Sequence, residues 1–387
     1  MNESKILFCL LRHIVCGEHL DTSLKAQLSQ ETLAALFRLA APHDLLHLAG
    51  RGLEALGMDS SQPMAQKFHT HTRQAIFRYA RLDLDLERIC AVLEREHISY
   101  IPLKGSVLRQ WYPEPWMRTS SDIDILIKRE DLETTRSLLE EKLRFSIGHR
   151  SDHDISLFSP SGTHLELHFS VESLEPVNAE QPILSNIWQY ATAAEGSYQH
   201  HLSDDMFYFY HIAHMAKHFL VAECGIRPIL DLWILNHRVI HNRSTRTALL
   251  QRGKLLPFAQ AAEALADVWF SCAEPSSVTE QLERYILQLG SQEAKNSAVA
   301  VGQQKTGGKL RFLWNKIFPS FSRMAAYYPS LKKYPWLLPV YAVRRWCRLL
   351  FTRDSRRALE TIKINATLSD GEIASAAELM QQLGLSR

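Results

Sequence analysis

The spacing of hydrophobic residues changes twice along the chain. Residues 1–97, and the chain from about residue 204 to the end, carry apolar positions three and four residues apart, as amphipathic helices do. Between them the period shortens, and short strands are predicted at residues 98–103, 123–127, 145–148, 155–158 and 164–169. Residues 131–143 again have helical spacing. The pattern predicts an α+β protein with a small mixed β-sheet core and flanking helices, enclosed by N-terminal and C-terminal all-helical lobes.

Breaks in this pattern divide the chain into four predicted segments. Proline, glycine and serine interrupt the helices near residue 42 and at 57–63, and Pro176 and Pro182 lead away from the predicted sheet. The expected segments are an N-terminal helical lobe, the sheet-containing core, a second helical lobe and a C-terminal helical region, over residues 1–97, 98–201, 202–290 and 291–387.

The composition is that of a globular protein. The 387 residues are 46% hydrophobic, and 44 Lys and Arg against 42 Asp and Glu give a net charge of +2, which does not by itself indicate a partner. Six scattered cysteines form no C-x-x-C pair, which disfavours a zinc ribbon or a disulfide scaffold. The N-terminus lacks a signal-peptide pattern, and no apolar run reaches the ~20 residues that span a bilayer. We therefore expect a cytoplasmic protein with no transmembrane segment.

Two aspartates alternate with isoleucines on the second predicted strand. Asp122 and Asp124 are two residues apart, so on a strand both carboxylates point to one face. A hard cation such as Mg²⁺ removes their mutual repulsion and also binds substrate phosphate oxygens. In two-metal phosphoryl or nucleotidyl transfer, such carboxylates activate the attacking hydroxyl. The alternative is a solvated strand edge with two surface aspartates, and the pair taken alone favours that alternative.

A Lys-Gly-Ser turn follows the first predicted strand. Gly105 would let backbone N–H groups approach phosphates, Ser106 adds a hydroxyl, and a helix starting near Ser106 would favour anions at its N-terminus. Lys104 supplies a positive charge. Ser121, directly before the first aspartate, is a further candidate for nucleotide binding. An ordinary strand-to-helix turn also uses glycine, and the spacing of a P-loop is absent.

The last predicted strand offers a third carboxylate. Glu166 and His168 share one strand face, so they could meet the two aspartates across the sheet. A half-exposed edge strand with a polar outer face would show the same alternation. Arg118, four residues before Asp122, could reach a phosphate or pair with an aspartate.

A row of histidines lies on the first helix predicted after the sheet. His211, His214 and His218 fall at i, i+3 and i+7, along one helix face. This spacing could ligate zinc, but the H-E-x-x-H signature is absent, and a structural or substrate-binding role is favoured. Further on, Arg227 is either a phosphate clamp or the ion-pair partner of Asp231, one helical turn along.

These motifs together resemble the DNA polymerase beta-like nucleotidyltransferase superfamily, and most closely its bacterial branch of uncharacterised nucleotidyltransferases. The resemblance covers residues 98–235 and rests on Leu103-Lys104-Gly105-Ser106, Arg118, Asp122-Ile123-Asp124, Glu166-Leu167-His168 and Gly225-Ile226-Arg227.

The resemblance implies that Gly105 and Ser106 hold the phosphates of a nucleoside triphosphate such as ATP, and that Asp122, Asp124 and Glu166 bind Mg²⁺, with Mn²⁺ as an alternative. Two features depart from the superfamily pattern. Fifteen residues separate Ser106 from Asp122, which is longer than usual, and the third acid is Glu166 where Asp is commoner. The second departure leaves the role of Glu166 as a base open.

A basic and aromatic stretch follows the helical lobe. Residues 294–353 contain twelve Lys and Arg, interleaved with aromatic residues, and no Asp or Glu. Such a composition suits RNA or DNA, and it also suits an anionic membrane surface. A helical lobe with an aromatic core and solvated cations is the third interpretation, and the sequence leaves all three open.

The sequence therefore predicts an Mg²⁺-dependent enzyme that transfers a nucleoside monophosphate from a nucleoside triphosphate to an unidentified hydroxyl or phosphate acceptor. Two alternatives remain. The first is a nucleotide-binding module without turnover that engages nucleic acid or protein through its basic C-terminal region. The second is a toxin-like modifier of tRNA or protein.

Overall fold

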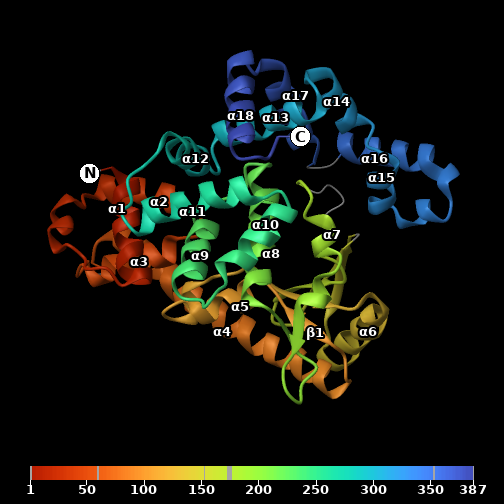
Figure 1. Ribbon diagram of the computed structural model, residues 1–387, viewed down its shortest axis with the longest axis horizontal. Helices are drawn as coiled ribbons and strands as arrows, with labels where there is room; N and C mark the ends of the chain where they lie inside the picture. The colour runs from red at the N-terminus through yellow and green to blue at the C-terminus, as the bar shows by residue number, and fades with distance from the viewer. Residues whose placement is uncertain (1, 59–60, 152, 172–176, 352–353, 387) are drawn as a thin grey trace.

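A computed structural model describes residues 2–58, 61–151, 153–171, 177–351 and 354–386 of the chain (Figure 1). Helices come first, then a sheet, then helices again, which confirms the predicted α+β class. The elements that precede the sheet are α1 (Glu3–Leu11), η1 (Arg12–Cys16), η2 (Thr22–Gln27), α2 (Gln30–Ala40), α3 (Leu46–Ala55) and α4 (Pro63–Arg95).

The sheet and the elements that follow it account for the rest of the described chain. The sheet region contains β1 (Tyr100–Pro102), α5 (Gly105–Leu108), η3 (Arg109–Trp111), η4 (Pro115–Met117), β2 (Asp122–Ile127), η5 (Arg129–Asp131), α6 (Leu132–Leu143), β3 (Ser146–Arg150), β4 (Asp154–Phe158) and β5 (His164–His168). The elements beyond it are α7 (Gln181–Leu184), η6 (Ile187–Tyr190), β6 (Ala191–Ala193), β7 (His200–Leu202), α8 (Asp204–Phe219), α9 (Ile226–His237), α10 (Arg243–Arg252), α11 (Leu256–Phe270), α12 (Ser277–Leu287), α13 (Gln292–Thr306), α14 (Lys309–Ile317), α15 (Phe321–Tyr327), η7 (Pro329–Lys332), η8 (Pro335–Leu337), α16 (Leu338–Phe351), α17 (Asp354–Thr367) and α18 (Asp370–Gln382).

The five-stranded sheet is mixed, with the strand order β1-β2-β5-β4-β3. Strands β2 and β5 run parallel, and the other neighbouring pairs run antiparallel. In the parallel pair, Asp122 lies opposite His164 and Asp124 lies opposite Glu166. The five predicted strands are present, with their ends moved by one or two residues.

The two faces of the sheet have different chemistry because side chains alternate along each strand. The isoleucines of β2, Ile123 and Ile125, pack with Leu165 of β5 in one core that also contains Ile89 and Leu93 of α4. The opposite face carries the acidic and histidine side chains of β2 and β5. Burial of the apolar face therefore fixes which way the polar face points.

A second core joins helices from distant parts of the chain. Helices α1 to α3 share it with α8 to α12, as the stacked rings of Phe8 and Trp269 illustrate, with centroids 4.7 Å apart. Phe68 places the first half of α4 in this core, while Leu82 places the second half against the sheet. The long helix α4 thus connects the helical body to the sheet.

The prediction missed a small hairpin made of β6 and β7, which pair antiparallel. Each strand has only three residues, too few to show a clear alternation. The Glu94 carboxylate at the end of α4 accepts backbone hydrogen bonds from Tyr198 and Gln199 and so ties the hairpin loop to α4. Pro176, predicted to lie in the connection that leads away from the sheet, is outside the described residues.

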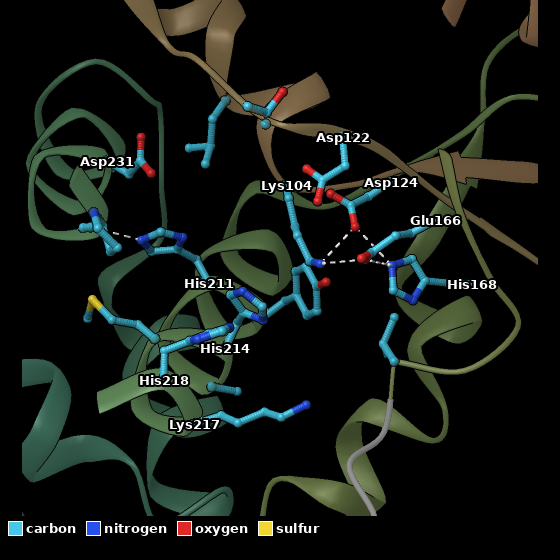
Figure 2. A pocket seen from close by; sticks show the side chains of 18 of the residues that line it. Lys104, Asp122, Asp124, Glu166, His168, His211, His214, Lys217, His218 and Asp231 are labelled. Carbon is cyan, nitrogen blue, oxygen red and sulfur yellow. Dashed lines mark hydrogen bonds and ion pairs between the residues drawn. The ribbon is translucent and has the colours of Figure 1, made fainter. Parts of the chain in front are cut away.

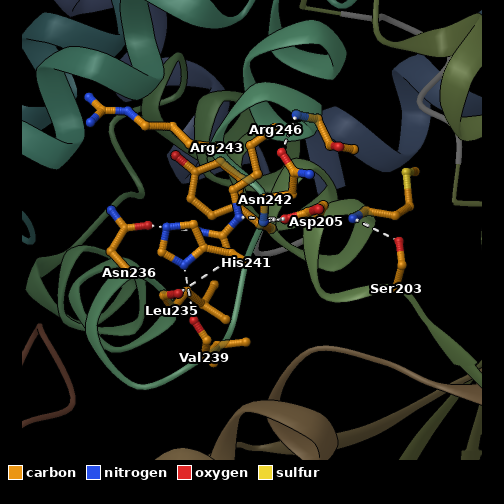
Figure 3. A network of polar contacts seen from close by, with 12 residues as sticks. Ser203, Asp205, Leu235, Asn236, Val239, His241, Asn242, Arg243 and Arg246 are labelled. Carbon is orange, nitrogen blue, oxygen red and sulfur yellow. Dashed lines mark hydrogen bonds and ion pairs between the residues drawn. The ribbon is translucent and has the colours of Figure 1, made fainter.

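A buried arginine links the three helices that follow the hairpin (Figure 3). Arg246 of α10 is 4% exposed. Its guanidinium donates to Asp205 of α8 at 3.1 Å, to the side chain of Asn236 on α9 at 2.8 Å and to the carbonyl of Leu235 at 3.3 Å. The same guanidinium lies 4.1 Å from the ring centroid of Tyr208. These contacts fix α8 relative to α9 and α10.

The substitution Arg246→Met is expected to lower the free energy of unfolding by about 3 kcal/mol, because it leaves the half-buried Asp205 carboxylate without its cation. Urea unfolding followed by circular dichroism measures the change. The matched control is Arg243→Met, which removes an exposed arginine from the same helix. Equal stability of the two variants would contradict the structural role of Arg246.

Candidate active site

A cavity of about 440 Å³ lies between the polar face of the sheet and helix α8. Figure 2 shows carboxylates on one side of it and the labelled α8 side chains on the other. The residues that line the sheet side include Asp122, Asp124, Glu166 and His168, and those from α8 include Tyr210, His214, Lys217 and His218. The cavity therefore places acidic groups opposite basic and neutral polar ones.

The parallel register of β2 and β5 brings three carboxylates together. Donor atoms of Asp122, His164 and Glu166 lie within 4.8 Å of one another, and so do those of Asp124, Glu166 and His168. Both groups have the ligand chemistry of a metal site. His164 was not predicted, although its position two residues before Glu166 on the same strand face is a signal that could have identified it.

Lys104 provides the positive charge nearest to these carboxylates. Its ammonium nitrogen donates to Asp124 Oδ1 at 2.7 Å and lies 3.7 Å from Glu166 Oε2. The residue has φ of 46°, in the left-handed region that side chains other than glycine rarely adopt, so the turn after β1 is strained. Burial disfavours the charged ammonium, but the charges of Asp124 and Glu166, the hydrogen bond to Asp124 and the nearby Tyr210 together outweigh it and raise the pKa of Lys104.

His168 joins the same network from β5. Its Nε2 donates to Asp124 Oδ1 at 2.9 Å and lies 3.4 Å from Glu166 Oε2. Burial opposes ionisation of Asp124, yet Lys104 and His168 hold the pKa of this carboxyl well below its usual range. The hydrogen bond from His168 also lowers the pKa of Glu166. Two of the three carboxylates are thus ionised and compensated by protein groups.

Asp122 is the uncompensated member of the group. Burial raises the pKa of Asp122, and the charges of Asp124 and Glu166 raise it further. Among the described residues, no hydrogen bond or ion pair reaches its carboxylate, and the Nε2 of the neighbouring His164 is a buried nitrogen without a hydrogen-bond partner. A divalent cation would satisfy both groups, so the residues present fit a metal site.

The Lys-Gly-Ser turn only partly matches its predicted role. Helix α5 has four residues and continues as a 3₁₀ turn, so it offers little of the dipole expected to attract phosphate. A Cβ at Gly105 would lie 3.1 Å from the Cβ of Ser120, so glycine lets α5 pack against that segment. Gly105 and Ser121 line the cavity, whereas Ser106 is not among the lining residues, and its buried hydroxyl has no partner in the described chain.

The predicted arginines form ion pairs, one buried and one partly exposed. Arg118 Nε donates to Asp231 Oδ1 at 2.6 Å, and the Tyr112 hydroxyl donates to the same oxygen at 2.7 Å. Arg227 pairs with Asp44 and not, as the alternative interpretation had it, with Asp231. Arg118 and Tyr112 both donate to Oδ1 of Asp231, whose buried Oδ2 has no partner in the described chain, and Arg227 instead reaches the Asp44 carboxylate in the turn between α2 and α3. These pairs fasten α9 to the segments before β2 and α3.

The three predicted histidines do not converge on one point. His211 Nε2 hydrogen-bonds the carbonyl of Pro228 at 3.0 Å, and His218 Nδ1 lies 3.4 Å from a carboxylate oxygen of Glu223. Burial lowers the pKa of His211 and that of His214, so both are neutral at neutral pH. None of the metal-binding groups found among the described residues includes them. Lys217 and Tyr210, which also line the cavity, were not predicted.

Residues 29–271 match the model of a family described as uncharacterised nucleotidyltransferases. The chain belongs to this family. No curated protein and no solved structure matches the chain. The family match confirms the resemblance to uncharacterised nucleotidyltransferases that was inferred from residues 98–235, and it extends this resemblance on both sides, from α2 to the end of α11. Membership in a nucleotidyltransferase family implies a nucleotide substrate, and the carboxylate and histidine cluster of this family member is a site that can hold a metal.

The substitution Asp122→Asn is expected to raise the Tm in EDTA by a few degrees. The folded-state pKa of Asp122 is raised, so its charge destabilises the metal-free fold at neutral pH, and a neutral amide removes that repulsion. The gain should shrink as the pH falls through the folded-state pKa and disappear below the lower unfolded-state pKa, where the carboxyl is protonated in both states. Differential scanning calorimetry in EDTA measures the Tm of the variant and of the wild type at neutral and at acidic pH.

The control for this experiment is Glu141→Gln, which neutralises an exposed carboxylate of α6. Its Tm should stay close to that of the wild-type protein. A Tm of Asp122→Asn below that of wild type in EDTA would show that Asp122 has a stabilising partner, contrary to the geometry.

Proposed function

We propose that this protein catalyses the divalent-cation-dependent transfer of a nucleoside monophosphate from a nucleoside triphosphate to a hydroxyl or phosphate acceptor. The observation that carries the proposal is the register of β2 and β5, which sets Asp122, Asp124 and Glu166 together at the cavity wall in a chain of a nucleotidyltransferase family.

The roles of the acidic residues follow from their surroundings. Asp122, Asp124 and Glu166 would hold Mg²⁺ or Mn²⁺. When bound, such an ion neutralises the charge of the phosphate oxygens and of the departing pyrophosphate. Glu166 is more exposed than Asp124, with a quarter of its side chain accessible, and it is the candidate to accept the proton of the acceptor hydroxyl.

The remaining cavity residues would bind the substrate. Gly105 and Ser121 lie beside the carboxylates and would contact the phosphates, together with the ammonium of Lys104. His214, Lys217 and His218 line the opposite wall and are suited to an anionic portion of either substrate. His211, Arg118, Arg227 and Asp231 would act by positioning α8 and α9, because each forms a hydrogen bond or an ion pair with another part of the protein.

A nucleotide-binding module without turnover is the second candidate. The ion pair of Lys104 with Asp124 favours it, because the pair compensates one carboxylate without any metal. Two results together would support this candidate. Calorimetric titration would show nucleotide binding, and no nucleoside triphosphate would release pyrophosphate.

The variant Asp124→Asn is expected to reduce pyrophosphate release on the order of a thousandfold, because a lost metal ligand removes several kcal/mol of transition-state stabilisation. The assay follows pyrophosphate in the presence of Mg²⁺ and cell extract as a source of acceptor. Circular dichroism checks that the variant is folded, and Glu141→Gln is the control that should keep full activity. Full activity of Asp124→Asn would refute the proposed chemistry.

The acceptor can be found with a nucleoside triphosphate labelled at its α-phosphate. Incubation with cell extract should transfer label to one class of molecule, and separation into RNA, protein and small molecules shows which. Label in tRNA or protein would identify the toxin-like modifier, and label in a metabolite would indicate a biosynthetic enzyme. Label that appears equally with Asp124→Asn would come from another enzyme in the extract.

A further inference from the structure

An exposed apolar stripe lies on α16, beyond the end of the family match. Trp336 in η8 and Val340, Val343 and Cys347 in α16 follow one another at i, i+4, i+7 and i+11, so they lie along one helix face. Trp336 is 71% exposed, Val340 61% and Val343 54%, and Cys347 is exposed as well. Isolated apolar residues are common on surfaces, but a continuous stripe indicates an interaction site.

The stripe is not part of the local core. The other side of the helix, with Leu338 and Tyr341, packs on the buried Met324 and Leu331. The Tyr341 hydroxyl also shares a hydrogen bond of 2.7 Å with Ser330. The described residues of this small core do not include the stripe, which therefore stays open to another contact.

Helix α14 repeats the arrangement. Leu310, Trp314 and Ile317 follow at i, i+4 and i+7 and are 85%, 61% and 38% exposed. Phe318, directly after this helix, contacts Trp346 of α16 with ring centroids 5.4 Å apart. The two exposed stripes therefore belong to adjoining helices.

The same region is strongly basic. Residues 294–353 contain no acidic residue, and the last two positions, 352–353, are outside the described residues. Lys332 and Lys333, four and three residues before Trp336, and Arg344, next to Val343, are all exposed. Helices α14 to α16 lie at one edge of the molecule, away from α3 and α4 (Figure 1). Apolar stripes with cations beside them are thus presented to the surroundings.

We propose that α14 to α16 form a docking surface for the headgroup region of an anionic membrane. Bilayer headgroups and the adjoining acyl chains match this surface because they offer negative charge and an apolar layer together, and Trp side chains favour that boundary. Nucleic acid would pair with the cations and stack on the aromatic rings, but it leaves the exposed leucine and valines unused. A second copy of the chain would bring the basic residues of both copies together.

The contact would be peripheral. None of the described helices combines the length and the apolar character needed to cross a bilayer. Membrane binding would therefore depend on the apolar contacts of the two stripes and on electrostatic attraction between the basic residues and the anionic headgroups. It should weaken as the salt concentration rises.

Sedimentation with sucrose-loaded vesicles tests this proposal on the full chain. The protein should bind vesicles of phosphatidylcholine and phosphatidylglycerol at least tenfold more tightly than vesicles of phosphatidylcholine alone. The double variant Trp336→Ser/Val340→Ser should bind the anionic vesicles at least tenfold more weakly. A charge variant, Lys332→Glu/Lys333→Glu, should lose affinity for the anionic vesicles to an extent comparable to the loss that high salt produces in the wild-type protein.

The matched control is Phe77→Ser/Ile240→Ser, which removes side chains that are 71% and 93% exposed outside this region. It should bind vesicles as the wild type does. Equal binding by Trp336→Ser/Val340→Ser, or no binding of wild type to anionic vesicles, would overturn the proposal. Tight binding to single-stranded RNA without vesicle binding would assign the surface to nucleic acid, and a stripe-dependent dimer in light scattering would assign it to a second copy. Each of these outcomes is independent of nucleotidyl transfer.

Discussion

Electrostatic repulsion among three carboxylates on neighbouring strands is the constraint on which the site depends. The parallel register of β2 and β5 sets Asp124 opposite Glu166, and the alternation along β2 adds Asp122 on the same face. Lys104 and His168 compensate Asp124 and Glu166 from within the protein, while Asp122 has no partner among the described residues. The fold thus holds an excess of negative charge at one point, and a bound cation would stabilise that arrangement.

The rest of the molecule keeps this charged face in place. Burial of the opposite face against α4 and α6 prevents a shift of register, because a slip by one residue would move the aspartates into the core. Helix α8, which forms the facing wall, is held by Arg246 from α10, and α9 is held by the buried pair of Arg118 and Asp231. These buried polar contacts position the helices that form the walls of the cavity.

Local periodicity in the sequence was enough to predict the sheet and which side chains of the candidate site share a strand face. Alternation placed Asp122 with Asp124, and Glu166 with His168, on shared faces. Features that depend on long-range pairing could not be obtained this way. The partner of Arg227 is Asp44, 183 positions away. The position of His164 opposite Asp122 depends on the register of β2 and β5, and Ser106 lies outside the cavity lining although its neighbour Gly105 is part of that lining. Sequence periodicity shows which residues share one face of a helix or strand. The surroundings of these residues depend on which faces of different elements contact one another in the fold.

The central claim is that the carboxylates of β2 and β5 form a divalent-cation site that serves a nucleotide. A crystal of the protein grown with Mn²⁺ and a non-hydrolysable nucleoside triphosphate tests it most directly, because manganese is located by its anomalous scattering. We expect an anomalous peak beside Asp122 and Asp124 with the triphosphate adjoining it. A bound nucleotide with no manganese at these carboxylates, or manganese bound elsewhere, would contradict it.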